Sequence, residues 1–325
     1  MNLEAAKRFL ESHHNFVLAA HRSPDGDTLG SCLGLRLALL DMGKNAVVVC
    51  ADPVPKNLRF LPASETVSAS LSGISDAVIY VDCADHARTD VLRDTLEQAD
   101  FQFCIDHHAT NPRCTRNGDW VEDVAATAEL VYRLLVSMNV SIRKEIALCL
   151  FTGIATDTGN FSYSNTTPDT FRIAGELQKC GIDLPELNRK LFRTVSLPKS
   201  KLIAFTLESV LLTEDNTVGI VCIPQDVIQR FHADESDCEG LIDFIRDIEP
   251  VEIACTLRES ADGTIRGSLR SKKGADVSKI ASRFGGGGHE HAAGFTLLPP
   301  MEKARDTVLA AMIQSVKEWK ESSQS

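Results

Sequence analysis

Histidine and aspartate side chains recur in four short segments of the 325-residue chain: "HRSPDGD" (21–27), "VDCAD" (81–85), "IDHHAT" (105–110) and "GIATDTGNF" (153–161). Imidazole nitrogens and carboxylate oxygens are ligands that borderline divalent ions such as Mn²⁺ accept. Any single aspartate of this kind is explained equally well as a helix cap or a turn residue. Four segments that each supply such ligands favour a metal centre.

Short apolar runs precede three of these segments and must position them. The runs "FVLAA" (16–20), "AVVVC" (46–50), "AVIYVD" (77–82) and "FQFCID" (101–106) predict buried strands of a parallel sheet with helices between them. Ligands of such sheets bind beyond the carboxyl ends of the strands. We therefore expect seven side chains to converge there: His21, Asp25, Asp27, Asp82, His107, His108 and Asp157.

Crowded carboxylates repel one another and raise one another's pKa, and divalent cations resolve this conflict. A mixture of histidine and aspartate ligands fits Mn²⁺ or a similar borderline ion better than it fits Ca²⁺, which is bound by oxygen ligands. The number of ligands predicts two ions. Asp106 is expected to orient a ligand or to cap the turn, and Ser31 is either an ordinary helix residue or a donor to a ligand carboxylate.

The remaining sequence predicts how these elements are organised. A helix is expected at 28–43, a polar helical stretch up to residue 98 and mostly helix from about 122 to 195. Beyond that, strands at 217–223, 251–259 and 264–271 precede a helix near 276–284, the stretch "GGGGHEHAAGFTLL" and a final amphipathic helix. We expect an α/β protein with a parallel-sheet catalytic domain (1–188), a helical linker (189–206), a smaller mixed α/β substrate-binding domain (207–325) and a cleft between them.

Composition narrows the classes of function. The net charge of −11 disfavours a general nucleic-acid coat, and two Trp with three Tyr offer few residues for stacking bases. Ten cysteines without a CxxC pair indicate reduced thiols, most of them buried. No signal peptide and no run of 18 apolar residues is found, so a cytoplasmic protein without membrane contact is expected. His86 and His232 are expected at the surface.

The four segments, read as "HRSPDGDTLGS", "VDCAD", "IDHHAT" and "TGIATDTGNFSYSNT", resemble the successive motifs of the DHH phosphoesterase superfamily, which is named for Asp-His-His. "GGGGHEHAAGF" is similar to the signature of the DHH-associated C-terminal domain. The two-domain form looks like the nanoRNase / pAp phosphatase group. That resemblance implies a manganese-dependent hydrolase of short oligoribonucleotides and of 3′-phosphoadenosine 5′-phosphate (pAp). An alternative is a phosphodiesterase of linear or cyclic dinucleotides, and homodimer formation is left open.

The resemblance also implies roles for single residues. His21, Asp25 and Asp82 would hold one ion, whereas Asp27, Asp82, His107 and Asp157 would hold the other, so that Asp82 bridges them. A hydroxide between the ions would attack phosphorus in line. His108 would contact the scissile phosphate and protonate the leaving oxygen.

The C-terminal domain is expected to select the substrate. Backbone N–H groups of a glycine-rich turn can cradle a phosphate, and an arginine can bind it through two hydrogen bonds. The predicted substrate contacts are Arg270, Ser271, Gly286, Gly287, Gly288 and His289. Lys272 and Lys273 are either a solvated turn or residues that steer anionic substrates.

Overall fold

The computed structural model describes residues 2–71, 76–272 and 274–322. Its chain forms two compact units, Met1–Thr194 and Val195–Ser325. The range 189–206, expected as a linker, includes the boundary between these units. Separate hydrophobic clusters form the core of each unit. The description below takes each unit by itself.

The first unit is built on a five-stranded sheet whose strands are all parallel, as predicted from the apolar runs. The order of the strands is β2-β1-β3-β4-β5. Their bounds are β1 Asn15–Ala19, β2 Asn45–Val49, β3 Ala77–Val81, β4 Phe101–Asp106 and β5 Asp119–Val121. Because β1, β3 and β4 are neighbours, the three segments that follow them leave the sheet side by side.

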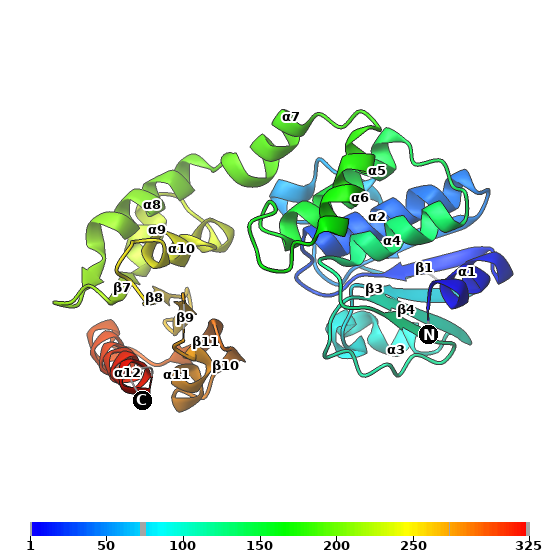
Figure 1. Ribbon diagram of the computed structural model, residues 1–325. Helices are drawn as coiled ribbons and strands as arrows, with labels where there is room; N and C mark the ends of the chain where they lie inside the picture. The colour runs from blue at the N-terminus through cyan, green and yellow to red at the C-terminus, as the bar shows by residue number, and fades with distance from the viewer. Residues whose placement is uncertain (1, 72–75, 273, 323–325) are drawn as a thin grey trace. The chain divides into compact units, whose positions relative to one another are not determined.

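Helices cover both faces of this sheet. Figure 1 shows α2, α4, α5 and α6 on one face and α3 on the other. The α-helical bounds are α1 Leu3–Ser12, α2 Gly26–Asp41, α3 Arg93–Leu96, α4 Thr127–Ser137, α5 Lys144–Asp157, α6 Pro168–Gln178 and α7 Leu184–Asn188. The 3₁₀ helices are η1 Lys56–Leu58, η2 Ser64–Thr66 and η3 His86–Leu92, and η4 Arg189–Arg193 is a π-helix. The burial of both faces explains why these strands have continuous apolar sequences.

Two expectations for the segment after β3 were wrong. Instead of one polar helix up to residue 98, the chain forms the 3₁₀ turns of η3, a break at Asp90 (φ 53°) and the four-residue α3. His86 is not a surface residue, because its ring is half-buried and stacks on Tyr80 with 3.9 Å between ring centroids. Tyr80 is fully buried in β3, so this stacking holds η3 against the sheet.

The second unit contains a mixed six-stranded sheet of order β10-β11-β9-β8-β7-β6. Only the β7–β8 pair is parallel among the described strands of this unit. The strands are β6 Leu211–Leu212, β7 Val218–Ile223, β8 Ile253–Glu259, β9 Ile265–Ser271, β10 Gly287–His289 and β11 Ala292–Leu297. The helices are α8 Leu197–Ser209, α9 Gln225–Arg230, η5 Glu235–Cys238, α10 Leu241–Arg246, α11 Val277–Arg283 and α12 Met301–Ser322.

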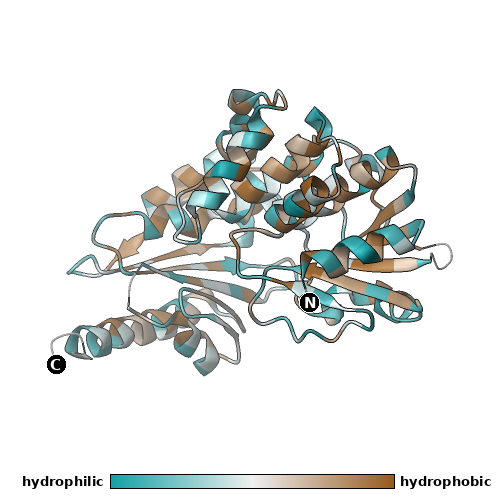
Figure 2. Ribbon diagram, turned by 45° about the vertical axis from the view of Figure 1, so that its right-hand side comes forward, coloured by the Kyte–Doolittle hydropathy of each residue, from teal (hydrophilic) through white to brown (hydrophobic). Residues whose placement is uncertain are grey.

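The two faces of this sheet are covered unequally. Apolar residues of α11 and α12 pack on one face, and in Figure 2 the mixed colours of α12 show its apolar and polar residues. Helices α8, α9 and α10 form the core of the other face, where α8 packs against β7 and α10 packs against β7, β8 and β9. The part of this second face that β8, β9 and β11 form is lined by polar residues. No helix among the described residues is long and apolar enough to cross a membrane.

Candidate metal centre

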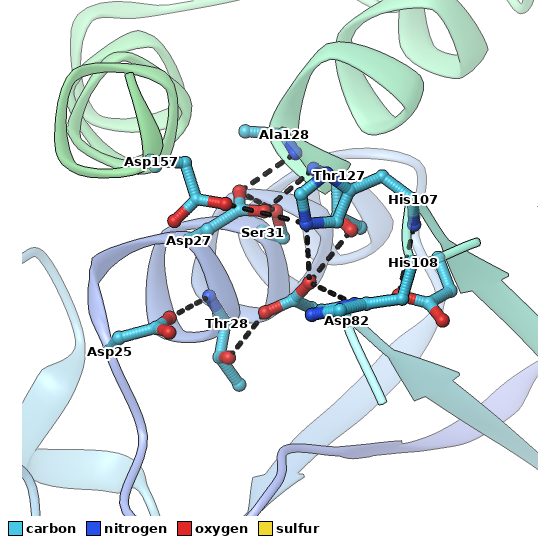
Figure 3. Close-up of polar contacts among 12 residues, drawn as sticks. Asp25, Asp27, Thr28, Ser31, Asp82, His107, His108, Thr127, Ala128 and Asp157 are labelled. Carbon is cyan, nitrogen blue, oxygen red and sulfur yellow. Dashed lines mark hydrogen bonds and ion pairs between the residues drawn. The ribbon is translucent and has the colours of Figure 1, made fainter. Parts of the chain in front are cut away.

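Three adjacent strands and two helices direct acidic and imidazole side chains to one point. His21, Asp82 and His107 follow the carboxyl ends of β1, β3 and β4. Asp25 is the N-cap of α2, and its carboxylate accepts a hydrogen bond from Thr28 N at 3.0 Å. Asp27 lies in the first turn of α2, and Asp157 is the last residue of α5. Figure 3 shows the side chains of Asp27, Asp82, Asp157 and His107 pointing toward one another.

Asp82 lies in the middle of this constellation. Its side chain is 2% exposed. His21 Nε2 lies 3.6 Å from one carboxylate oxygen, Oδ2, and His107 Nε2 lies 3.6 Å from the other, Oδ1. Both oxygens therefore face separate imidazoles, an arrangement in which a single carboxylate can contact two ions.

The ligand atoms fall into three groups whose members lie within 4.8 Å of one another. The groups are His21 with Asp25 and Asp82, Asp27 with His107 and Asp157, and Asp82 with His107 and His108. All seven side chains that were expected to converge are therefore brought together. Asp82 and His107 each belong to two groups, so the groups form one continuous site.

Each imidazole is fixed through the nitrogen that faces away from the other ligands. His21 Nδ1 lies 2.6 Å from the carbonyl oxygen of Arg22, and His107 Nδ1 lies 3.1 Å from that of Val124. A carbonyl oxygen can only accept a hydrogen bond, so Nδ1 of each ring carries a proton. In the neutral ring, Nε2 therefore carries a lone pair. Metal-binding histidines are commonly held in this way by an acceptor at the second nitrogen.

Asp27 links α2 to the start of α4. Its carboxylate is completely buried and accepts hydrogen bonds from Thr127 N at 2.6 Å and Ala128 N at 2.9 Å. These N–H groups belong to the first turn of α4, which lacks partners within the helix. Ser31 Oγ, 3.1 Å from Asp27 Oδ1, is a third donor, which decides between the two roles considered for this serine.

Asp106 fixes the two consecutive histidines rather than joining the ligand groups. Its Oδ1 accepts from His107 N at 2.9 Å and lies 2.8 Å from His108 Nδ1, while Oδ2 accepts from Asn111 Nδ2 at 2.7 Å. The pKa of Asp106 is lowered, because its hydrogen bonds with His108 and Asn111 outweigh the cost of burial. The carboxylate thus remains ionised and raises the pKa of His108.

The electrostatics of the other ligands show an excess of negative charge. Burial and the charges of Asp82 and Asp157 raise the pKa of Asp27 well above its usual value. Burial and the charges of Asp82 and Asp25 raise the pKa of Asp157 to about 8. Burial disfavours the charged form of His21, but hydrogen bonds with Asp25 and Asp82 outweigh it and raise its pKa to about 9. Without cations, the cluster retains protons, and divalent ions would replace them.

Two threonines contribute to the site that the sequence did not indicate as functional. Thr28 Oγ1 donates to Asp82 Oδ2 at 2.6 Å, and Thr127 Oγ1 donates to Asp82 Oδ1 at 2.9 Å. Each carboxylate oxygen of Asp82 thus has one hydroxyl donor. For Thr127, the sequence signal was its place at the start of the helical pattern after "EDVAA", but the partner lies 45 residues away.

In the second unit, some of the predicted substrate contacts share one face of the sheet. Arg270 is opposite Ala292, which is opposite His289, and directly opposed residues of a sheet point to the same side. Gly287 is opposite Gly294 on the neighbouring strand. The structure therefore places Arg270, Gly287 and His289 on the face that the helices leave partly open.

Two glycines of this segment, which was expected to form a turn, lie in a strand of a β-hairpin. Gly287 and Gly288 lie in β10. A Cβ on Gly286 would lie 2.1 Å from the carbonyl oxygen of Gly294, so this position permits the close approach of β11. Gly288 has φ +149°, and a Cβ there would lie 2.4 Å from the carbonyl oxygen of Ala292.

The structure does not bring Ser271 together with Arg270. Successive side chains alternate between the faces of β9, so Ser271 points to the opposite side. It is buried, and its hydroxyl lies 2.9 Å from His291 Nδ1. Lys272 Nζ donates to the carbonyl oxygens of Ile248 and Glu249 at 2.6 and 3.0 Å, while Lys273 lies outside the described residues.

Known proteins match both units. Residues 15–154 match the DHH family, N-terminal domain, and residues 219–318 match the DHHA1 domain. The bifunctional oligoribonuclease and PAP phosphatase NrnA of Thermus thermophilus is 37% identical over 91% of this chain and 88% of its own. An exopolyphosphatase-related protein from Bacteroides fragilis has a similar structure, with a TM-score of 0.89, 27% identity and coverage of 99% and 97% of the two chains. The structure of RecJ from Thermus thermophilus in complex with Mn²⁺ shares the fold, with a TM-score of 0.58, 16% identity and coverage of 97% of this chain and 55% of RecJ.

Proposed function

We propose that this chain, which belongs to the DHH family and carries a DHHA1 domain, hydrolyses phosphate esters in short oligoribonucleotides and in pAp. Both classes of substrate are in the name of the Thermus thermophilus relative. Both present a phosphate ester next to a second phosphate or nucleotide. A catalytic cluster and a separate unit with anion-binding residues suit such molecules.

The ligand groups fit two divalent ions, and Mn²⁺ is the ion we expect. His21 and Asp25 would hold one ion, Asp27, His107 and Asp157 would hold the other, and Asp82 would contact both. When bound, the ions would lower the pKa of water and neutralise charge on the phosphoryl oxygens. The residues around them supply orientation, because Thr28 and Thr127 fix the two oxygens of Asp82.

His108 is the residue that we propose for proton transfer. Asp106 engages its Nδ1 at 2.8 Å, which leaves Nε2 for the substrate. The side chain is 35% exposed, so a ligand can reach it. Because Asp106 favours the protonated imidazole, His108 would donate a proton to the leaving oxygen as the ester bond breaks.

The second unit would hold the part of the substrate that is not cleaved. Arg270 and His289 lie on the same face of the sheet and can donate hydrogen bonds to a phosphate. The backbone N–H groups of Gly287 and Gly288 stay predicted contacts, whereas the N–H of Gly286 donates to the carbonyl oxygen of Ala281 at 3.0 Å. Ser271 would act indirectly, because its hydroxyl engages His291.

The observation that carries this proposal is the position of Asp82 between two imidazoles. A buried carboxylate whose oxygens lie 3.6 Å from two imidazole nitrogens, with further carboxylates on both sides, matches the chemistry of a two-metal site. A structural role alone does not require five aspartates and histidines around it.

The test is a paired assay of phosphate release from pAp and mononucleotide release from RNA dinucleotides to pentanucleotides. We expect both activities with Mn²⁺, no activity with excess chelator and a loss of roughly a thousandfold in Asp82→Ala. Asp94→Asn, a charge change at an exposed position of α3, is the matched control and should leave both rates unchanged. Activity on dinucleotides alone would favour the dinucleotide phosphodiesterase, and inactivity on every substrate with metal bound would contradict the proposal.

A further inference from the structure

A pair of arginines lies on the same face of the sheet as the proposed phosphate contacts, Arg270 and His289. Arg266 is four residues from Arg270 along β9, and residues of even spacing share one face of a strand. Arg258 of β8 is directly opposite Arg266 in the register. The distance along β9 from Arg270 to Arg266 is about 13 Å. This backbone separation lets the pair bind a phosphate group other than the one at Arg270.

The residues between the two ends leave room for a ligand. The intervening row across the sheet consists of Thr256, Ser268 and Gly294, which are directly opposite one another. Their small side chains border a cavity of about 940 Å³ that also reaches Arg258, Arg266 and Arg270. A hydroxyl-lined channel between two cationic ends suits a chain of phosphates and riboses better than an apolar ligand.

The pairing of two arginines needs an explanation, because like charges directly opposite in a sheet destabilise it. Glu235 relieves part of this repulsion at 3.5 Å from Arg258. Asp262 also borders the cavity, but its Oδ1 accepts from Thr264 N and Oγ1 at 3.0 and 2.6 Å. Arg266 is exposed and has no carboxylate within ion-pair distance among the described residues. An anionic ligand would satisfy it.

We infer that Arg266 and Arg258 form a second phosphate site, which binds the backbone of oligoribonucleotides too long to be held by Arg270 and His289 alone. This inference rests on the proposed function, because it takes phosphorylated nucleotides as the ligand class. It adds a determinant of substrate length. A substrate such as pAp has one phosphate besides the one that is cleaved, and a single site in the second unit is sufficient for it.

The test compares variants across substrate length. In Arg266→Gln and Arg258→Gln, we expect KM for tetranucleotides and pentanucleotides to rise about fivefold to tenfold, with kcat unchanged. Turnover of pAp and dinucleotides should stay within about twofold of wild type. Arg283→Gln is the matched control, because Arg283 lies on α11 and donates to Gln314 of α12, away from this face. It should alter no substrate.

Equilibrium binding of a fluorescent RNA pentanucleotide in EDTA separates this inference from the proposed function. Loss of one phosphate contact should make the slope of log K against log salt less negative by about 0.7 in either variant, which a structural defect would not do. Equal weakening of short and long substrates, or an unchanged salt slope, would overturn the second phosphate site. An inactive wild-type protein would instead contradict the proposed function. The binding measurement would still test the second phosphate site in that case.

Discussion

At the scale of single residues, the chemistry depends on how firmly Asp82 is held. It follows β3 with φ 56°, a region that aspartate adopts more readily than most residues but still at a cost. Its N–H donates to the carbonyl oxygen of Ile105 at 2.9 Å, which ties this turn to β4. The strained turn and the two threonine hydroxyls together aim both oxygens at the neighbouring imidazoles.

Thr127→Val should test the contribution of these hydroxyls. The substitution removes the 2.9 Å hydrogen bond to Asp82 Oδ1 but keeps the N–H bond to Asp27. Groups that orient metal ligands change affinity by about tenfold to a hundredfold when they are removed, so Mn²⁺ should bind at least about tenfold more weakly. Isothermal titration measures this, and Thr307→Val on the exposed side of α12 is the control. Unchanged affinity would contradict a role for the Thr127 hydroxyl in orienting Asp82.

Metal binding should release protons near neutral pH. His21, with a pKa of about 9, and Asp157, with a pKa of about 8, both hold a proton at pH 7 in the metal-free site. Ligation requires the deprotonated forms, so Mn²⁺ affinity should rise as the pH increases from 6 to 8. Titrations at pH 7 in buffers of different ionisation enthalpy count the released protons. A binding enthalpy that is independent of the buffer would contradict this prediction.

At the scale of elements, the site depends on the close approach of α2 and α5, which carry Asp27 and Asp157. A Cβ on Gly30 would lie 2.4 Å from the carbonyl oxygen of Cys149, and a Cβ on Gly153 would lie 2.7 Å from Asp27 Oδ1. Both glycines therefore let the helices approach until their carboxylates share one site.

Gly30→Ala should separate these helices. We expect a loss of about 1 to 3 kcal/mol in the free energy of unfolding, as in other overpacked cores, together with weaker Mn²⁺ binding. Gly175→Ala on α6 is the matched control, because a Cβ there meets no atom within 4 Å. That variant should be more stable by about 0.5 to 1 kcal/mol. Urea unfolding measures both, and equal effects of the two substitutions would contradict the packing argument.

The apolar runs predicted the elements that carry the site, because a strand buried on both faces has a continuous apolar sequence. Short edge strands have no such signal, so β5 and the two-residue β6 were not predicted. Helices α9 and α10, of six residues each, were missed for the same reason. The convergence of seven side chains could be predicted because their residue types are distinctive. Thr28 and Thr127 could not, because a threonine becomes functional only through a partner that folding brings to it.

At the scale of the whole molecule, each unit has its own core and one of the two tryptophans. Trp120 is buried in β5 of the first unit, and Trp319 lies in α12 of the second. The proposed metal ligands belong to the first unit alone. Ligand binding stabilises the structure that holds the ligand, by about 2.7 kcal/mol at a concentration of 100 Kd.

Single-tryptophan variants should therefore report different effects of Mn²⁺. In Trp319→Phe, fluorescence of Trp120 should show unfolding of the first unit at a higher temperature when Mn²⁺ is present. In Trp120→Phe, Trp319 should report a much smaller shift for the second unit. An equal shift in both variants would show that the units unfold together or that the metal binds elsewhere.

The most direct measurement of the central claim is anomalous diffraction from crystals grown with Mn²⁺. The account predicts two manganese peaks on either side of the Asp82 carboxylate, one next to His21 and Asp25 and the other next to Asp27, His107 and Asp157. A single peak, or two peaks that do not share Asp82, would contradict the two-metal centre on which the proposed hydrolysis depends.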